Sequence, residues 1–121
     1  MAANAAAIAK LNDEARRALG VGCKLVVTPG IRALPDMVQS RIRERVELFD
    51  DFKEGNDPHG EHDFGAFDQA GAGKVFWKID YYARGARTGP DLHPLLPYLS
   101  ENPASTASTV RVLTIMLAEE Y

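Results

Sequence analysis

The chain of 121 residues has the length of one domain, and its 45% hydrophobic and 26% charged residues exclude a disordered or fibrous protein. No apolar run approaches the roughly 20 residues that cross a bilayer, and the Ala-rich start lacks the basic leader of a signal peptide. One cysteine excludes an internal disulfide and a thiolate zinc cage. We therefore expect a single cytoplasmic domain over residues 1–121, with no membrane partner.

The acidic charge is concentrated in one segment. Residues 47–68 hold eight acidic side chains and one basic side chain, whereas residues 1–46 hold four acidic and eight basic ones. Such a concentration of like charge attracts cations or basic surfaces. The simpler alternative is an acidic loop that is merely solvated.

The first part of the chain predicts a helix followed by a strand. Apolar residues recur at helical spacing from Ile8 to Leu19, and Gly20 supplies a stop. Residues 24–28 are short and β-branched, and Pro29-Gly30 closes them with a turn.

A second helix is predicted from Leu34 to Phe49, with Pro35 near its first turn. Its apolar residues recur every three or four positions and leave Arg41, Arg43 and neighbouring charged residues toward water. Arginines can contact nucleic acid, but no aromatic or glycine-rich motif accompanies these and the chain is acidic. We therefore expect a salt-bridged solvent face and no direct binding of nucleic acid.

The remaining strands complete an α+β fold. Residues 63–69 and 74–82 alternate and are joined by a Gly-containing connection, which predicts a hairpin. Residues 83–108 indicate a long loop with a short helical turn near Leu95. Residues 109–117 favour a central strand, with a buried helix as the alternative. We expect an antiparallel sheet of about four strands with two helices packed on one face.

A polar stretch from Phe49 to Phe67 is the candidate functional site. It holds two of the three histidines and most of the clustered carboxylates, and its phenylalanines can bury as anchors. Its charge predicts a protein partner with a basic surface. The expected partner-binding residues are Asp50, Asp51, Glu54, Asp57, His59, Glu61, His62 and Asp63.

A metal site is an alternative for the same stretch. If Ala70 faces Gly73 in the hairpin, Ala66 faces Trp77 and Asp63 faces Asp80, and a slip of one residue would turn Trp77 outward. Opposed carboxylates destabilise a sheet unless a cation or a shared proton compensates. A metal-dependent hydrolase or nuclease would use His59, Glu61, Asp63 and Asp80.

The spacing of these residues argues against that alternative. It matches neither the His-Glu-x-x-His motif nor the calcium loop. We therefore expect no catalytic residues and no cofactor, with a divalent metal left open. A third alternative is a structural domain, in which Asp57 caps backbone amides and the histidines bond locally.

Three blocks of the sequence carry a resemblance to a known family. Residues 49–67, 76–82 and 111–121 resemble the domain of unknown function 3768, a family of small uncharacterised proteins of bacterial plasmids and integrative elements. The family brings no assigned activity. This chain has Ala83, Asn102 and Ser105 where the family tends to have carboxylates, which leaves fewer ligands for a metal.

The resemblance implies a biological context. Small acidic proteins of mobile elements often counter host defences, which bears on function here by analogy. It implies a non-enzymatic anti-defence module, anti-CRISPR or anti-restriction, whose acidic loop binds a nucleic-acid-binding defence complex.

Overall fold

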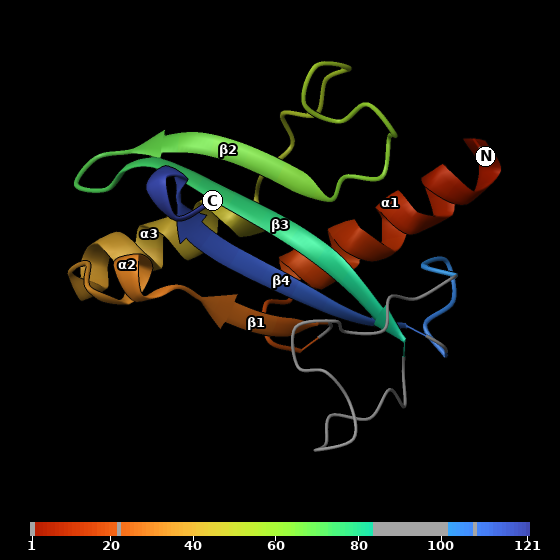
Figure 1. The fold of residues 1–121 in the computed structure, drawn as a ribbon, viewed down its shortest axis with the longest axis horizontal. Helices are drawn as coiled ribbons and strands as arrows, with labels where there is room; N and C mark the ends of the chain where they lie inside the picture. The colour runs from red at the N-terminus through yellow and green to blue at the C-terminus, as the bar shows by residue number, and fades with distance from the viewer. Residues whose placement is uncertain (1, 22, 84–101, 108) are drawn as a thin grey trace.

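The computed structural model describes residues 2–21, 23–83, 102–107 and 109–121. Most of the loop predicted over 83–108, including the helical turn expected near Leu95, lies outside these described residues. Figure 1 shows an α+β fold in which a sheet is backed by helices. In chain order the elements are α1 (Ala2–Arg17), β1 (Lys24–Val27), α2 (Pro29–Arg32), α3 (Asp36–Glu47), β2 (Phe64–Gln69), β3 (Gly73–Ala83), β4 (Thr109–Leu117) and the 3-10 helix η1 (Ala118–Glu120).

The sheet has four strands in the order β1-β4-β3-β2, which confirms the expected strand number and the α+β class. The expectation of a wholly antiparallel sheet was wrong, because β1 runs parallel to β4, with Lys24 opposite Val112. A short turn forces neighbouring strands to be antiparallel. No such turn joins β1 to β4, which are far apart in the sequence. Residues 109–117 form the strand that was expected to be central.

The core lies between the sheet and the helices. Figure 1 shows α1 and α3 behind the sheet, and Val75, Trp77 and Ile79 of β3 are at most 3% exposed, as expected for their face. Burial of such side chains contributes roughly 1.5–3 kcal/mol each. The same cluster contains Ile31, Ile42, Val46, Phe67, Leu113 and Ile115.

The short helix α2 was not predicted. Pro29 occupies its first turn, where a missing backbone N–H costs little. Glu120 accepts a hydrogen bond from the Gly30 backbone nitrogen at 3.0 Å and another from the Thr28 hydroxyl at 2.6 Å. The expected turn at Pro29-Gly30 is thus a helical turn supported by a side chain from a distant segment.

The hairpin register differs by one residue from the prediction. Gly65, not Ala66, lies opposite Trp77. The indole covers this position, where a β-carbon would lie only 2.3 Å from Trp77 Nε1, so glycine fits there and alanine does not. Trp77 remains buried because β4 fixes its face by pairing it with Ile115. Relative to the prediction, this register therefore moves the side chains of β2 to the opposite face of the sheet and leaves those of β3 on the predicted face.

The expected opposition of Asp63 and Asp80 does not occur in this register. The Asp63 carbonyl accepts a hydrogen bond from the Ile79 backbone nitrogen at 2.8 Å. Asp80 instead forms an ion pair with Lys78 on the same strand, at 3.2 Å.

Among the described residues, we find no helix with the length and apolar character needed to cross a membrane.

Candidate functional site

The polar loop, defined here as residues 50–63, is fixed to the core by aromatic rings. Phe49 and Phe52 contact each other edge to face with 5.1 Å between ring centroids, and both meet Trp77. Phe67 is buried at 8% exposure. Phe64, which was expected to be a further anchor of the loop, packs on Phe76 instead, at 5.4 Å. Phe64 lies opposite Lys78, and Phe76 lies opposite Ala66. Because side chains alternate along a strand, both phenylalanine rings lie on the face of the sheet opposite to that of Trp77.

The loop also binds to itself through short-range hydrogen bonds. The Asn56 side chain accepts from the Lys53 backbone nitrogen at 2.7 Å and donates to the Asp51 carbonyl at 2.9 Å. The Asp57 nitrogen donates to the Lys53 carbonyl at 2.7 Å. An Asn that bonds nearby backbone groups stabilises a turn, so the loop is a folded turn with a defined outer surface.

His62 joins this loop to α1. Its ring stacks on Phe52, with centroids 3.9 Å apart and planes within 1°, and its Nδ1 lies 3.0 Å from Asp13 Oδ1. Its backbone nitrogen donates to Asp57 Oδ1 at 3.2 Å, as expected for Asp57 as a cap of backbone amides. His62 has a φ of 56°, a conformation that costs a non-glycine residue free energy. The contacts of its side chain and amide offset that cost.

Arg16 extends the same connection into the core. Its side chain is 1% exposed, and it donates to Asp13 at 2.7 Å and to the Phe49 carbonyl at 2.9 Å. Its guanidinium lies 5.3 Å from the centroids of both the Phe52 and the Trp77 rings. Burial lowers the pKa of Arg16, and the bond to Asp13 opposes that effect. Arg16 therefore ties α1 to the end of α3 and the start of the loop.

A second buried network lies beside the first. Asn12, at 0% exposure, donates to the Tyr81 hydroxyl at 2.8 Å and to the Glu61 carbonyl at 2.9 Å, and accepts from Arg111 Nε at 2.7 Å. The Tyr81 hydroxyl donates to Glu61 Oε1 at 3.1 Å. Burial raises the pKa of Tyr81, which keeps the phenol neutral. Asn12 thus joins α1 to the loop and to β3 and β4.

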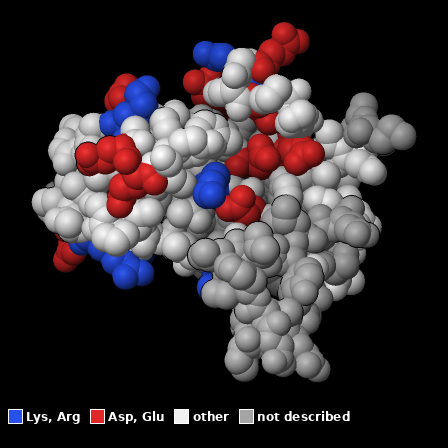
Figure 2. Space-filling model, in the orientation of Figure 1, with Lys and Arg blue, Asp and Glu red and all other residues white. Residues whose placement is uncertain are grey.

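The eight expected partner-binding residues fall into two groups. Asp57 is buried, and Glu61, His62 and Asp63 are half-buried, so their side chains face the networks or the sheet edge. The exposed group consists of Asp50, Asp51, Glu54 and His59. Figure 2 shows acidic side chains gathered over this loop and the adjoining part of the sheet. The structure therefore separates the side chains that hold the loop from those that it displays.

Two of the four expected metal ligands are engaged in other contacts. Glu61 bonds Tyr81, Asp80 pairs with Lys78, and His59 is exposed. Burial, and next the charge of Glu61, raises the pKa of Asp63. Within the part of the chain that the structure describes, no three His, Cys, Asp or Glu side chains are grouped as a metal site.

Asn12, Arg16 and Arg111, which organise the site, were not among the residues predicted from the sequence. A signal was present, because Asn12 and Arg16 follow Ile8 by four and eight positions and lie on the buried stripe of α1. Arg111 alternates with Leu113 and Ile115 on the inner face of β4.

Comparison with known protein families assigns the chain to one of them. The model of the family described as "Protein of unknown function (DUF3768)" matches residues 27–120. The chain belongs to this family. The DUF3768 match covers the polar loop and β2 to β4, and it begins after α1. The α1 residues that hold the loop, Asn12, Asp13 and Arg16, therefore lie outside the matched range. No curated protein and no solved structure matches the chain.

Proposed function

We propose that this DUF3768 protein is a cytoplasmic, non-enzymatic protein-binding module that uses the polar loop to bind a basic surface. The observation that carries the proposal is that the acidic side chains of the loop fall into an internally bonded group and an exposed group. Asp57 and Glu61 are used internally, in contacts with His62 and Tyr81. Asp50, Asp51 and Glu54 are exposed, and the one ion pair among them within the described chain joins Asp51 to Lys53 at 3.2 Å.

The rigidity of the loop supports a binding role. A surface that is ordered before binding loses less conformational entropy when the complex forms. Phe49 and Phe52 hold one end of the loop on Trp77, and His62 holds the other on Asp13. The outer carboxylates are therefore presented from a preformed frame.

We extend the proposal to the class of partner. Exposed carboxylates on a fixed frame suit Lys and Arg side chains that otherwise bind phosphate. A net charge of −3 is low for imitation of a long DNA segment, so the imitation is confined to the loop. By this argument, and by analogy with small acidic proteins of mobile elements, the partner is a restriction or CRISPR nuclease complex.

The test compares two triple charge reversals that change the net charge equally. In one, Asp50, Asp51 and Glu54 become Lys. In the control, Glu14, Glu44 and Glu119, which are exposed and outside the loop, become Lys. The probes are purified restriction and CRISPR nuclease complexes, and the measurement is competition with a double-stranded DNA target at two salt concentrations.

We expect the wild-type chain to compete with DNA for at least one complex, more weakly at high salt. Each close interfacial charge pair is coupled by about 1.5 kcal/mol or more. The loop variant loses three such pairs, so it should bind on the order of 1000-fold more weakly. The control should bind as the wild type does. Equal losses in both variants, or no competition by the wild type, would refute the proposal.

A further inference from the structure

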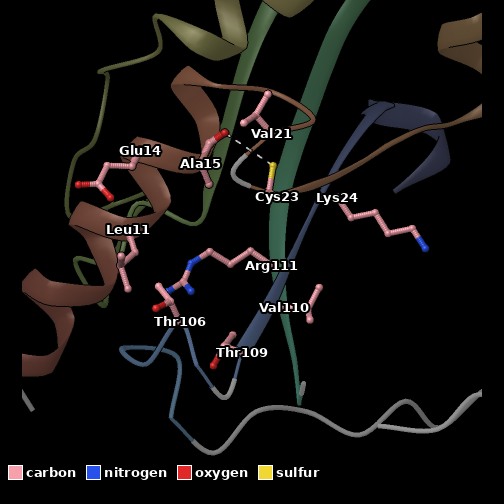
Figure 3. Close-up of a pocket in the computed structure, with 10 residues that line it drawn as sticks. All are labelled: Leu11, Glu14, Ala15, Val21, Cys23, Lys24, Thr106, Thr109, Val110 and Arg111. Carbon is pink, nitrogen blue, oxygen red and sulfur yellow. Dashed lines mark hydrogen bonds between the residues drawn. The ribbon is translucent and has the colours of Figure 1, made fainter. Parts of the chain in front are cut away.

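A cavity separate from the polar loop lies where α1 meets the first residues of β1 and β4 (Figure 3). Its volume of about 380 Å³ is at the small end of the range for small-molecule sites. None of its described lining residues belongs to the polar loop. In Figure 3 the side chain of Arg111 crosses the cavity toward Leu11 and Thr106.

Arg111 places a positive charge in this cavity, and no carboxylate of the described residues is paired with it. It is 5% exposed, and it donates from Nε to Asn12 and from Nη2 to the Pro103 carbonyl. Its guanidinium lies 5.4 Å from the centroid of the Tyr81 ring. Within the described chain no carboxylate lies in ion-pair range of Arg111, and Nη1 makes no hydrogen bond, whereas Arg16 has Asp13 at 2.7 Å.

A buried charge without a counter-ion is costly, and the cost falls when an anion binds. Burial lowers the pKa of Arg111, and the charges of Tyr81 and Glu61 only partly oppose this. A carboxylate oxygen of a ligand that accepted a hydrogen bond from Nη1 would supply the missing partner.

The walls of the cavity define the rest of the ligand. Leu11, Ala15, Val21 and Val110 give it apolar surface, which suits a short hydrocarbon body. Glu14 and Lys24 also line it, with opposite charges that offset each other, so Arg111 leaves the described lining with one net positive charge. Arg111 Nη1 makes no hydrogen bond within the described chain, so the cavity matches a ligand with a single negative charge.

We propose that this cavity binds a small monocarboxylate with a short apolar tail, its carboxylate on Arg111 and its tail against the apolar wall. This inference does not rest on the function proposed for the polar loop. A ligand of this size gains only a few kcal/mol, so the dissociation constant is on the order of 1 mM.

The test uses hexanoate and its neutral analogue hexanamide as probes. Amide NMR titration of the full chain should give saturable shifts at Leu11, Val21 and Val110 with hexanoate, and binding of hexanamide at least about tenfold weaker, the loss of one charge-assisted hydrogen bond. Alkylation of Cys23, which lines the cavity and is the single cysteine, should slow when hexanoate is bound.

Three variants distinguish hexanoate binding in this cavity from nonspecific binding elsewhere on the chain. Arg111→Gln should abolish hexanoate binding, whereas Arg17→Gln, an exposed arginine outside the lining, removes the same charge and should not. If Arg111→Gln fails to fold, Leu11→Trp fills the cavity without touching the network and should abolish binding in a folded chain. Equal binding of both probes, shifts outside the cavity, or no saturation overturns the proposal.

Discussion

The contact between Gly65 and Trp77 allows a quantitative prediction for Gly65→Ala. The added β-carbon would lie 2.3 Å from Trp77 Nε1, 2.6 Å from Trp77 Cε2 and 2.8 Å from Phe49 Cε1. All three atoms belong to packed rings, and Trp77 is 0% exposed, so neither ring can move aside freely. Overpacking of a core costs about 1–3 kcal/mol, and two crowded rings place this case near 3 kcal/mol.

The loss should be measured by urea and thermal unfolding followed by far-ultraviolet circular dichroism. For a domain of this size we expect Tm to fall by about 10 °C. Gly55→Ala is the matched control, because a β-carbon at Gly55 meets no atom within 4 Å. Its free energy of unfolding should stay within about 0.5 kcal/mol of the wild-type value.

A double-mutant cycle tests the cause of the loss. Trp77→Phe removes the ring that carries Nε1, so the cost of Gly65→Ala should be at least halved in that background. Crowding of Trp77 is refuted as the cause if Gly65→Ala is as stable as Gly55→Ala, or if the cost of Gly65→Ala is unchanged when Trp77 is replaced.

Two further predictions concern long-range hydrogen bonds. Tyr81→Phe removes a hydroxyl bonded to both Asn12 and Glu61 and should lower the free energy of unfolding by about 1–2 kcal/mol, whereas Tyr82→Phe, whose hydroxyl makes no bond within the described chain, should change little; equal effects would contradict the assigned network. Hydrogen bonds from the Thr28 hydroxyl and then the Leu117 nitrogen lower the pKa of Glu120, so the stability it contributes is fully present above pH 4.5, its ordinary value, and is lost as pH falls through the lower folded value. The stability gap between wild type and Glu120→Gln in urea titrations should close over that acidic range, and a gap independent of pH would count against the bonds to Glu120.

Much of the fold follows from local patterns in the sequence. The helical spacing around Ile8 and Ile42 predicted α1 and α3, and alternation around Trp77 predicted β3 and its buried face. The direction of β1 could not be predicted in this way, because it depends on pairing with a strand far along the chain. The hairpin register depended on a single steric fact, the fit of Gly65 under an indole, which alternation does not reveal.

The candidate site was located by its charge, but its organisation was not predicted. Charge clustering identified the polar loop, and the side chains that hold it are polar residues buried on elements expected to be apolar inside. Asn12 and Arg16 lie on the inner stripe of α1, where periodicity favours hydrophobic residues. Their burial is stabilised by partners such as Glu61 and Phe49, which lie on other elements.

The position of β4 in the sheet has a consequence for how the chain acquires its structure. β1 and β3 both attach to this strand, and Lys24 must find Val112. Contacts of such long sequence separation slow folding, because a large loop must close before they form. During synthesis, β1 and the hairpin wait with unpaired edges until residues 109–117 emerge from the ribosome. Chaperones that shield exposed strands should therefore act on this chain before residues 109–117 emerge.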